Sequence, residues 1–212
     1  MKNIYLPVLS AITVFLLPEV NLNAQEKDNS SPVSIGADLV SRYVWRGTDF
    51  GGSPSIQPFI EAEIYGVTFG AWGAYTINAP GAQEADLYIS YTIADMVSVG
   101  FTDYCFPDDI PGTMNYFSDS AHIIEFNAGL SAGDLSFSAN INLMNDDDYS
   151  LYFEVGYSFE FIDVFMGAGN GIYTVETAVP DYDSVDEPDP DHDFMIVNAG
   201  VTASKDIKVS QS

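Results

Sequence analysis

Apolar and polar residues alternate along most of the chain from residue 33 onward. A period of two is typical of β-strands whose two faces meet different surroundings, because successive side chains of a strand point to opposite sides. In residues 134–144 the alternation is complete: Leu135, Phe137, Ala139, Ile141 and Leu143 alternate with Ser136, Ser138, Asn140 and Asn142.

The same pattern predicts an all-β fold of about ten strands, each roughly ten residues long, because helical periodicity is absent. The expected strands are 33–45, 55–65, 67–77, 84–93, 96–105, 121–130, 134–144, 149–161, 164–174 and 194–203.

The connections between these strands alternate between tight and long. This sorting places all tight turns at one end of the sheet and all long loops at the other, which is typical of outer-membrane β-barrels. A soluble up-and-down barrel or a sandwich can also alternate, but its architecture does not require the loop lengths to be sorted. The tight connections fall at Gly66, 94–95, 131–134, 162–163 and 204–206, and the long ones at 47–54, 78–83, 106–120, 145–148 and 176–193.

Strand length favours a membrane as the surroundings of the apolar face. A tilted strand of about ten residues spans a bilayer, whereas strands of soluble proteins average nearer five or six residues. Backbone groups in hydrocarbon must all be hydrogen-bonded, so a sheet in lipid has to close. We therefore expect an antiparallel, transmembrane, up-and-down β-barrel with apolar side chains toward lipid and polar side chains toward the lumen.

The first 24 residues have the pattern of a cleaved signal peptide. Lys2 precedes an apolar run of about 14 residues, and Ala24 offers a small residue at the cleavage point. The run is shorter than the roughly 20 residues that a spanning helix needs. We expect a signal peptide at 1–24, a short periplasmic segment at 25–32 and an outer-membrane barrel at 33–212.

The strand count points to a barrel that continues past residue 212. Bacterial barrels have an even number of strands. After ten strands and a tight turn at 204–206, residues 207–212 begin an eleventh strand. We expect a twelve-stranded barrel that lacks here the rest of strand eleven and all of strand twelve, or else a ten-stranded barrel with a polar tail.

The polar positions of the strands predict the lining of a pore. Arg42 and Arg46 lie four residues apart on the polar side of the first strand. Glu61 and Glu63 on the next strand are expected to face them as cross-strand partners. The full set of expected pore-lining residues is Asp38, Arg42, Arg46, Glu61, Glu63, Asp86, Glu125, Glu154 and Glu160.

Two aromatic residues alternate with these arginines. Tyr43 and Trp45 are expected to point outward near the long-loop rim, as part of an aromatic girdle. They belong to the sequence Y-V-W-R-G at 43–47, which P-S-I-Q-P and G-A-W-G follow in order. This succession resembles the TorF-like family of porins, most densely over residues 33–77. The resemblance implies a β-barrel with a channel role and supplies no catalytic residues.

The composition is strongly acidic: 31 Asp and Glu against 6 Lys and Arg give a formal net charge of −25. Such a chain has too few cationic side chains to bind nucleic acid through its phosphates, and its field favours cations. Cys105 is the only cysteine, so no intrachain disulfide can form. We expect it to be an ordinary, partly buried thiol.

One long loop is rich in carboxylates. Oxygen-rich clusters suit Ca²⁺, but this loop lacks the glycine and the terminal glutamate of an EF-hand, so a solvated acidic loop is the alternative. The weak calcium candidates are Asp181, Asp183, Asp186, Glu187, Asp189, Asp191 and Asp193.

The sequence offers little for catalysis. Its two histidines are His122, which lies near Ser120, and His192 in the acidic loop. Neither has a nucleophile or a metal-ligating partner at a motif spacing. We expect that the protein is not an enzyme and that it uses no cofactor.

Two hypotheses for function follow. The first is a porin-like channel for passive diffusion of small hydrophilic solutes, with a preference for cations, because small wall residues leave space and carboxylates outnumber arginines in the lumen. The second is a non-conducting barrel with a plugged lumen, which acts in surface binding or structure through its acidic extracellular loops. The expected partners are outer-membrane lipid and small solutes or cations, and the oligomeric state stays open.

Overall fold

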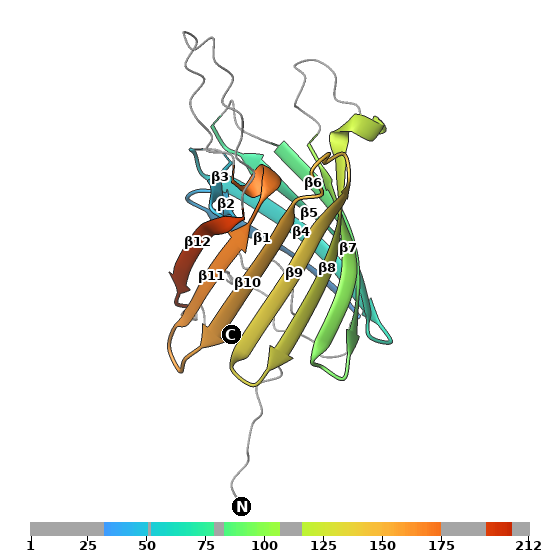
Figure 1. Ribbon diagram of the computed structural model, residues 1–212. Coiled ribbons are helices and arrows are strands. Elements are labelled where there is room, and N and C mark those ends of the chain that lie inside the picture. Colours follow the sequence, from blue (N-terminus) through green and yellow to red (C-terminus); the bar gives the residue numbers. More distant parts are fainter. Residues whose placement is uncertain (1–31, 51, 79–82, 107–115, 175–193, 205–212) are drawn as a thin grey trace, which may run out of the picture.

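The computed structural model describes residues 32–50, 52–78, 83–106, 116–174 and 194–204, and the predicted signal peptide lies outside these ranges. The described chain forms an antiparallel sheet of ten strands in which neighbours along the chain are also neighbours in the sheet (Figure 1). The predicted all-β, up-and-down order of strands is therefore confirmed. The strands are β1 (Val33–Val40), β4 (Ser55–Ile64), β5 (Val67–Thr76), β6 (Gln83–Ile93), β7 (Val97–Cys105), β8 (His122–Ala132), β9 (Leu135–Met144), β10 (Leu151–Ser158), β11 (Asp163–Gly169) and β12 (Met195–Thr202).

The remaining elements are small. β2 (Val44–Trp45) and β3 (Thr48–Asp49) form a two-stranded hairpin between β1 and β4, and two short 3₁₀-helices are η1 (Asp119–Ala121) and η2 (Gly171–Tyr173). In the part of the chain that the structure describes, no helix has the length and apolar character needed to cross a bilayer.

The first predicted strand, 33–45, is wrong in its second half. β1 ends at Val40, and the chain then bends into the hairpin of β2 and β3. Arg46 and Gly47 close this hairpin with φ angles of 47° and 89°. Positive φ at both central residues is typical of the two-residue hairpin turn whose twist matches that of its strands. The predicted strand 164–174 is wrong in its last five residues, because β11 ends at Gly169 and the 3₁₀-helix η2 follows. The other eight predicted strands are confirmed, although their ends differ by a few residues.

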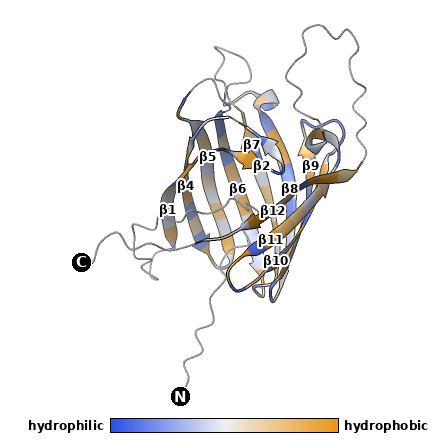
Figure 2. Cartoon of the chain, turned by 90° about the vertical axis from the view of Figure 1, so that its left-hand side faces the viewer, coloured by the Kyte–Doolittle hydropathy of each residue, from blue (hydrophilic) through white to orange (hydrophobic). Residues whose placement is uncertain are grey.

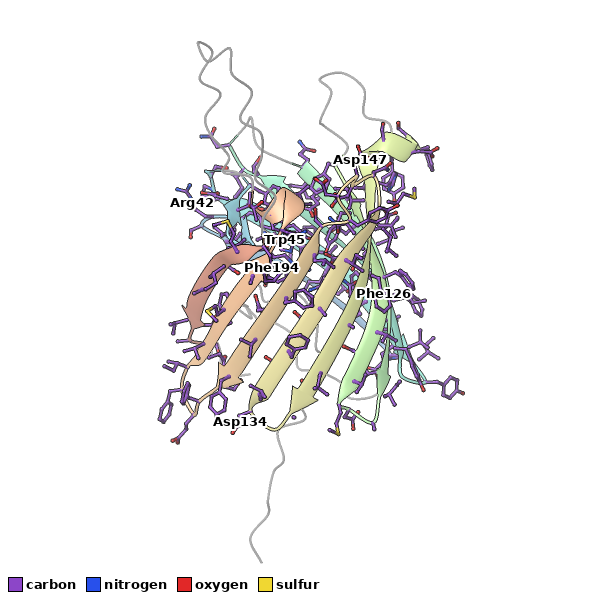
Figure 3. The ribbon with its side chains drawn as sticks, in the orientation of Figure 1. Arg42, Trp45, Phe126, Asp134, Asp147 and Phe194 are labelled. Carbon is purple, nitrogen blue, oxygen red and sulfur yellow. The ribbon has the colours of Figure 1, made fainter. Side chains whose placement is uncertain are left out.

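The predicted sorting of the connections holds for the described residues. The tight turns 65–66 and 94–95 have positive φ at every residue, as two-residue hairpins require. Figure 3 shows Asp134, in another tight turn, at one end of the sheet and Asp147, in a longer connection, at the opposite end. Short and longer connections therefore lie at different ends of the strands.

The two faces of the sheet differ sharply in polarity. Hydrophilic and hydrophobic residues alternate along the strands (Figure 2). Large apolar side chains of the outer face stay exposed, for example Ile35 at 69% and Phe101 at 47%. Polar side chains of the inner face are buried, and the strand residues Ser55, Gln57, Glu84, Asp86, Ser98, Thr102, Glu125, Asn127, Asn140 and Asn142 make up this set.

Glycines on the inner face bring large rings close to the sheet. A Cβ atom added to Gly70 would lie 2.5 Å from the Tyr88 ring, and one added to Gly167 would lie 2.2 Å from the Tyr152 hydroxyl. Such close approach is possible only where the opposite residue has no side chain. The absence of a side chain at Gly167 therefore allows Tyr152, a residue of the candidate site, to lie close to the sheet.

The sheet curls into a partial cylinder with β1 and β12 as its two edges (Figures 1 and 2). Among the described residues no pairing joins β1 to β12, so the sheet is open where a closed barrel was expected. The hairpin of β2 and β3 reaches β12, because a Cβ atom on Gly47 would lie 2.5 Å from the Val197 carbonyl oxygen. The segment 207–212, predicted as an eleventh strand, lies outside the described residues.

Candidate functional site

The candidate site surrounds Arg46, which the hairpin turn carries into the concave side of the sheet. The Arg46 guanidinium forms a forked ion pair with Glu125 of β8: Nη1 bonds to Oε2, and Nη2 lies 3.0 Å from Oε1. Nη1 also donates to the Tyr173 hydroxyl at 2.6 Å. The two charged side chains are 5% and 0% exposed. A buried, bidentate pair of this kind fixes the orientation of the arginine as well as its charge.

Aromatic rings enclose the guanidinium. Its central carbon lies 4.4 Å from the ring centres of Trp45 and Tyr152 and 5.1 Å from that of Tyr173. These distances lie within the range of cation–π attraction, which strengthens when the cation is desolvated. We call the side chains of Trp45, Tyr104, Glu125, Tyr152 and Tyr173 around Arg46 the arginine cage.

Several donors hold the Glu125 carboxylate in place. Tyr104 of β7 donates to Oε1 at 2.8 Å, and Tyr173 of η2 donates to Oε2 at 2.9 Å. Asn127 donates to Oε1 at 2.5 Å and also to Asn140 at 3.1 Å. The carboxylate is therefore positioned by side chains of three elements besides the hairpin that brings the arginine.

Electrostatics keeps the cage in one protonation state. Burial by itself lowers the pKa of the Arg46 guanidinium, but the Glu125 carboxylate outweighs this effect and the pKa is raised well above its ordinary value. Burial raises the pKa of Tyr173, although Arg46 opposes the change. Arg46 is thus a cation and Tyr173 a neutral hydroxyl, which matches the hydrogen bonds that they form.

A second anchor holds the hairpin at β6. The Tyr43 hydroxyl donates to Glu84 at 2.7 Å, and the Tyr43 ring packs on Trp72 and on Phe50 with ring centres 5.6 and 5.2 Å apart. Burial, and then the Glu84 carboxylate, raise the pKa of Tyr43 well above its ordinary value. Tyr43 and Arg46 therefore attach the hairpin to two separate parts of the wall.

The predicted aromatic girdle of Tyr43 and Trp45 is wrong. Tyr43 is only 2% exposed, and Trp45 packs inside the cage against Tyr104 and Tyr173 at 5.3 and 5.8 Å between ring centres. The reason is the end of β1 at Val40: once the chain leaves the sheet, the alternation of the sheet no longer decides which way a side chain points. Both rings belong to the interior.

The predicted pairing of the two arginines with Glu61 and Glu63 is also wrong. The Arg42 side chain is 58% exposed and pairs across the hairpin with Asp49 (Figure 3 labels Arg42). Glu61 accepts a hydrogen bond from Tyr88 at 2.9 Å, while Glu63 is exposed at the far end of β4. The arginines therefore do not share a face of one strand.

The other predicted pore-lining residues are distributed along the interior. Asp38 is half-buried on β1 opposite Gln57, and Asp86 is buried and accepts the Cys105 N–H at 3.3 Å. Glu154 is half-buried and accepts from the Tyr152 hydroxyl at 2.5 Å. Glu160 is exposed beyond the end of β10. Of the nine predicted residues, the structure brings Arg46 and Glu125 into direct contact.

Sequence reasoning missed the tyrosines of the cage and Glu84. The available signal was parity: Tyr104 alternates in step with Thr102, and Tyr152 in step with Glu154, so both lie on the polar side of their strands. Glu84 likewise stands two residues before Asp86 on the same side of β6. An aromatic residue on the polar side of a strand is the feature that marks this site.

The remaining candidates lie elsewhere. His122 contacts the Asp103 carboxylate at 2.8 Å and the Tyr116 carbonyl oxygen at 2.5 Å, while Ser120 contacts Ser118. Cys105 is a buried free thiol. Nowhere in the described ranges do three His, Cys, Asp or Glu side chains gather as metal ligands. The calcium candidates at 181–193 lie outside those ranges, and so does His192, which belongs to the same loop.

The fold and the site define an all-β protein built on a curved antiparallel meander with a polar interior. The chain belongs to the family described as "Bacterial protein of unknown function (Gcw_chp)", which matches residues 24–204 and so includes every described strand. Neither a search of curated proteins nor a search of solved structures found a match. The family description assigns no activity.

Proposed function

We propose that this protein is a β-barrel of the bacterial outer membrane and that it forms a narrow, cation-preferring channel for small hydrophilic solutes. The observation that carries the proposal is the distribution of polarity over the sheet. Side chains such as Gln57 and Glu125 are 0% exposed, whereas Ile35, Leu87 and Phe101 on the other face are 69%, 49% and 47% exposed. Soluble proteins mostly keep Asn, Gln, Asp and Glu side chains at the surface and rarely expose apolar patches beyond a few hundred Å².

Contact of the outer face with lipid explains this distribution of polarity better than contact with water does. In a bilayer the outer apolar face is stabilised by hydrocarbon, and the polar face lines a hydrated axis. The long strands, such as β6 (Gln83–Ile93) and β8 (His122–Ala132), fit the roughly 9–11 residues of a tilted membrane strand. Closure of the sheet between β1 and β12 is part of the proposal, because unpaired backbone groups are not tolerated in hydrocarbon.

The signal-peptide pattern and the resemblance to TorF-like porins also support the proposal of an outer-membrane channel. The signal-peptide pattern of residues 1–24 directs the chain out of the cytoplasm. The resemblance of residues 33–77 to TorF-like porins favours a channel role. Neither argument depends on the geometry of the interior, so they support the proposal independently.

The arginine cage forms the constriction of this channel. It occupies the interior at the hairpin end of the sheet, where β7, β8, β10 and η2 converge on Arg46. Carboxylates outnumber cations on the inner wall: Glu61, Glu84, Asp86, Glu125 and Glu154 lie on the inner side of the described strands, and Arg46 is the buried cation that pairs with one of them, Glu125. An excess of negative charge beside a narrow passage favours cations over anions.

Single-channel recording in planar bilayers tests the proposal. The wild-type chain should conduct with a small conductance and a reversal potential that favours cations. Arg46→Ser should increase both conductance and cation preference, because it removes the buried cation of the cage and loosens the constriction. Arg42→Ser is the matched control and should leave both unchanged, since Arg42 lies outside the cage. Anion preference in the wild type would refute the proposal.

A plugged, non-conducting barrel is the second candidate. The observation in its favour is that Arg46 and Glu125 are almost fully buried and mutually bonded, which describes a satisfied internal network. Such a barrel would act through its acidic loops at the surface, in binding or in structure. A folded Arg46→Ser variant that carries no current would support this alternative, because opening of the cage should be enough to permit conduction.

A further inference from the structure

Four residues of the arginine cage, which we call its wall half, form hydrogen bonds and ring contacts among themselves. They are Tyr104, Glu125, Tyr152 and Tyr173. Tyr104 and Tyr173 donate to opposite oxygens of Glu125, at 2.8 and 2.9 Å, and Asn127 adds a third bond. The Tyr152 and Tyr173 rings stand beside this carboxylate with ring centres 5.5 Å apart. These residues belong to β7, β8, β10 and η2, so the pocket is a property of the wall.

The cation of the cage, Arg46, belongs to the hairpin of β2 and β3 and has an unfavourable backbone conformation. Arg46 has φ of 47°, in the left-handed region that asparagine and glycine occupy readily and that arginine seldom adopts. The hairpin that holds it consists of two strands of two residues each. The turn conformation itself does not favour arginine, so the contacts of the Arg46 side chain account for the presence of arginine at this position.

The wall half has the chemistry that recognises a guanidinium group. A carboxylate with both oxygens presented to one side accepts the two parallel N–H donors of a planar fork, as Arg46 shows with Oε1 and Oε2 of Glu125. The ring centres of Tyr152 and Tyr173 lie 4.4 and 5.1 Å from the guanidinium carbon, within the range of cation–π attraction. A spherical cation would use the charge and the ring faces of this pocket but could not form the two parallel hydrogen bonds with Glu125.

We propose that the wall half of the cage, made by Tyr104, Glu125, Tyr152 and Tyr173, is a binding site for solutes that carry a guanidinium group, and that Arg46 occupies it as a tethered substitute. A free guanidinium solute replaces Arg46, and the hairpin then moves off the wall. The role of this exchange in passage rests on the proposed channel function. The binding itself is a property of the folded chain and is measurable without conduction.

Chemical rescue tests the site. Arg46→Ala in the detergent-refolded chain leaves Glu125 buried without its cation and should lower the melting temperature. Millimolar methylguanidinium should restore it in a saturable way, at concentrations far below those at which guanidinium unfolds proteins. The double variant Arg46→Ala/Glu125→Gln should show no rescue. Methylammonium should bind at least about tenfold more weakly, because it cannot form the fork.

The wild-type chain gives a second measurement that does not depend on the folding of Arg46→Ala. Trp45 lies 4.4 Å from the Arg46 guanidinium, and Trp72 is the other tryptophan of the chain. In a Trp72→Phe background, methylguanidinium should change the Trp45 fluorescence in a saturable way, with weaker affinity than for Arg46→Ala because Arg46 competes.

The results of these two assays can overturn the guanidinium site, the channel or neither. Rescue by sodium chloride at equal ionic strength, equal affinity for methylammonium, or absence of saturable binding in both assays would overturn the inference. Conduction without guanidinium binding would remove this site and leave the channel. Saturable, Glu125-dependent binding in a chain that does not conduct would keep the site and refute the channel.

Discussion

At the scale of single residues, the two arginines near the hairpin differ in what they contribute to stability. Arg46 and Glu125 are 5% and 0% exposed, whereas Arg42 is 58% exposed beside Asp49. Loss of one partner of a buried pair leaves an uncompensated charge and costs about 3–5 kcal/mol. An exposed pair contributes only about 0–1 kcal/mol, because water screens it. Surroundings, and not residue type, decide the difference.

Glu125→Gln should therefore lower the free energy of unfolding by about 3–5 kcal/mol. The reason is that the substitution keeps the shape of the side chain and leaves Arg46 buried without its carboxylate. Urea unfolding of the detergent-refolded chain measures the loss. Arg42→Ala is the control and should cost less than about 1 kcal/mol. Similar losses in both variants would contradict the assignment of Arg46 to the interior.

Alkaline pH should destabilise the folded chain through its buried tyrosines. Burial raises the pKa of Tyr43 and Tyr173 in the folded state, so their stabilising contribution is fully present below the ordinary tyrosine pKa of about 10. As pH rises further, the unfolded state loses these protons first, and stability falls. Melting temperatures between about pH 8 and pH 11 should drop less steeply in Tyr43→Phe and Tyr173→Phe. A wild-type slope unchanged by both substitutions would contradict the prediction.

At the scale of elements, the hairpin of β2 and β3 is held by its contact with β12 as well as by the cage. Gly47 has φ of 89°, and a Cβ atom there would meet the Val197 carbonyl oxygen at 2.5 Å. Gly52 also has positive φ, at 54°, but a Cβ atom on it would meet nothing within 4 Å. A comparison of substitutions at Gly47 and Gly52 therefore separates the cost of positive φ from the cost of a steric clash with β12.

Gly47→Ala should accordingly destabilise the chain by about 1–3 kcal/mol more than Gly52→Ala does. Both variants carry the cost of positive φ, roughly 1–2 kcal/mol, but only the first pushes the hairpin off β12. Thermal unfolding in detergent measures the difference, and conductance should rise only in Gly47→Ala. Equal destabilisation would show that the hairpin does not pack on β12.

Most elements were predictable from the sequence, and the hairpin was not, for one physical reason. Alternation reports which side chains share a face only while the chain stays extended in the sheet. It therefore located strands such as β9 and β10, and it failed at Tyr43 and Trp45, where the pattern continues after β1 has ended at Val40. The turn at Arg46 and Gly47 lacks the asparagine or aspartate that would have signalled it.

At the scale of the whole molecule, the site joins residues far apart in the sequence. Arg46 contacts Glu125 across 79 positions and Tyr173 across 127. Alternation assigns a residue to a face but does not give its height along the sheet, so Glu125 could be predicted as interior but not as the partner of Arg46. The tyrosines of the cage were missed because an aromatic side chain was expected on the apolar side of its strand.

Placement of the outer face in lipid makes a prediction for neighbouring residues of one strand. Ile89 and Ser90 lie near the middle of β6 and point to opposite faces, with Ile89 49% exposed. Ile89→Lys should impair folding into lipid vesicles by about 2–4 kcal/mol, because it places a charge in hydrocarbon. Ser90→Lys places the same charge on the inner face, where water and carboxylates accommodate it, and should be tolerated. The fraction of protein inserted and protected from protease measures both. If Ser90→Lys blocks folding while Ile89→Lys leaves a stable, detergent-independent protein, the apolar face does not meet lipid and the channel proposal fails.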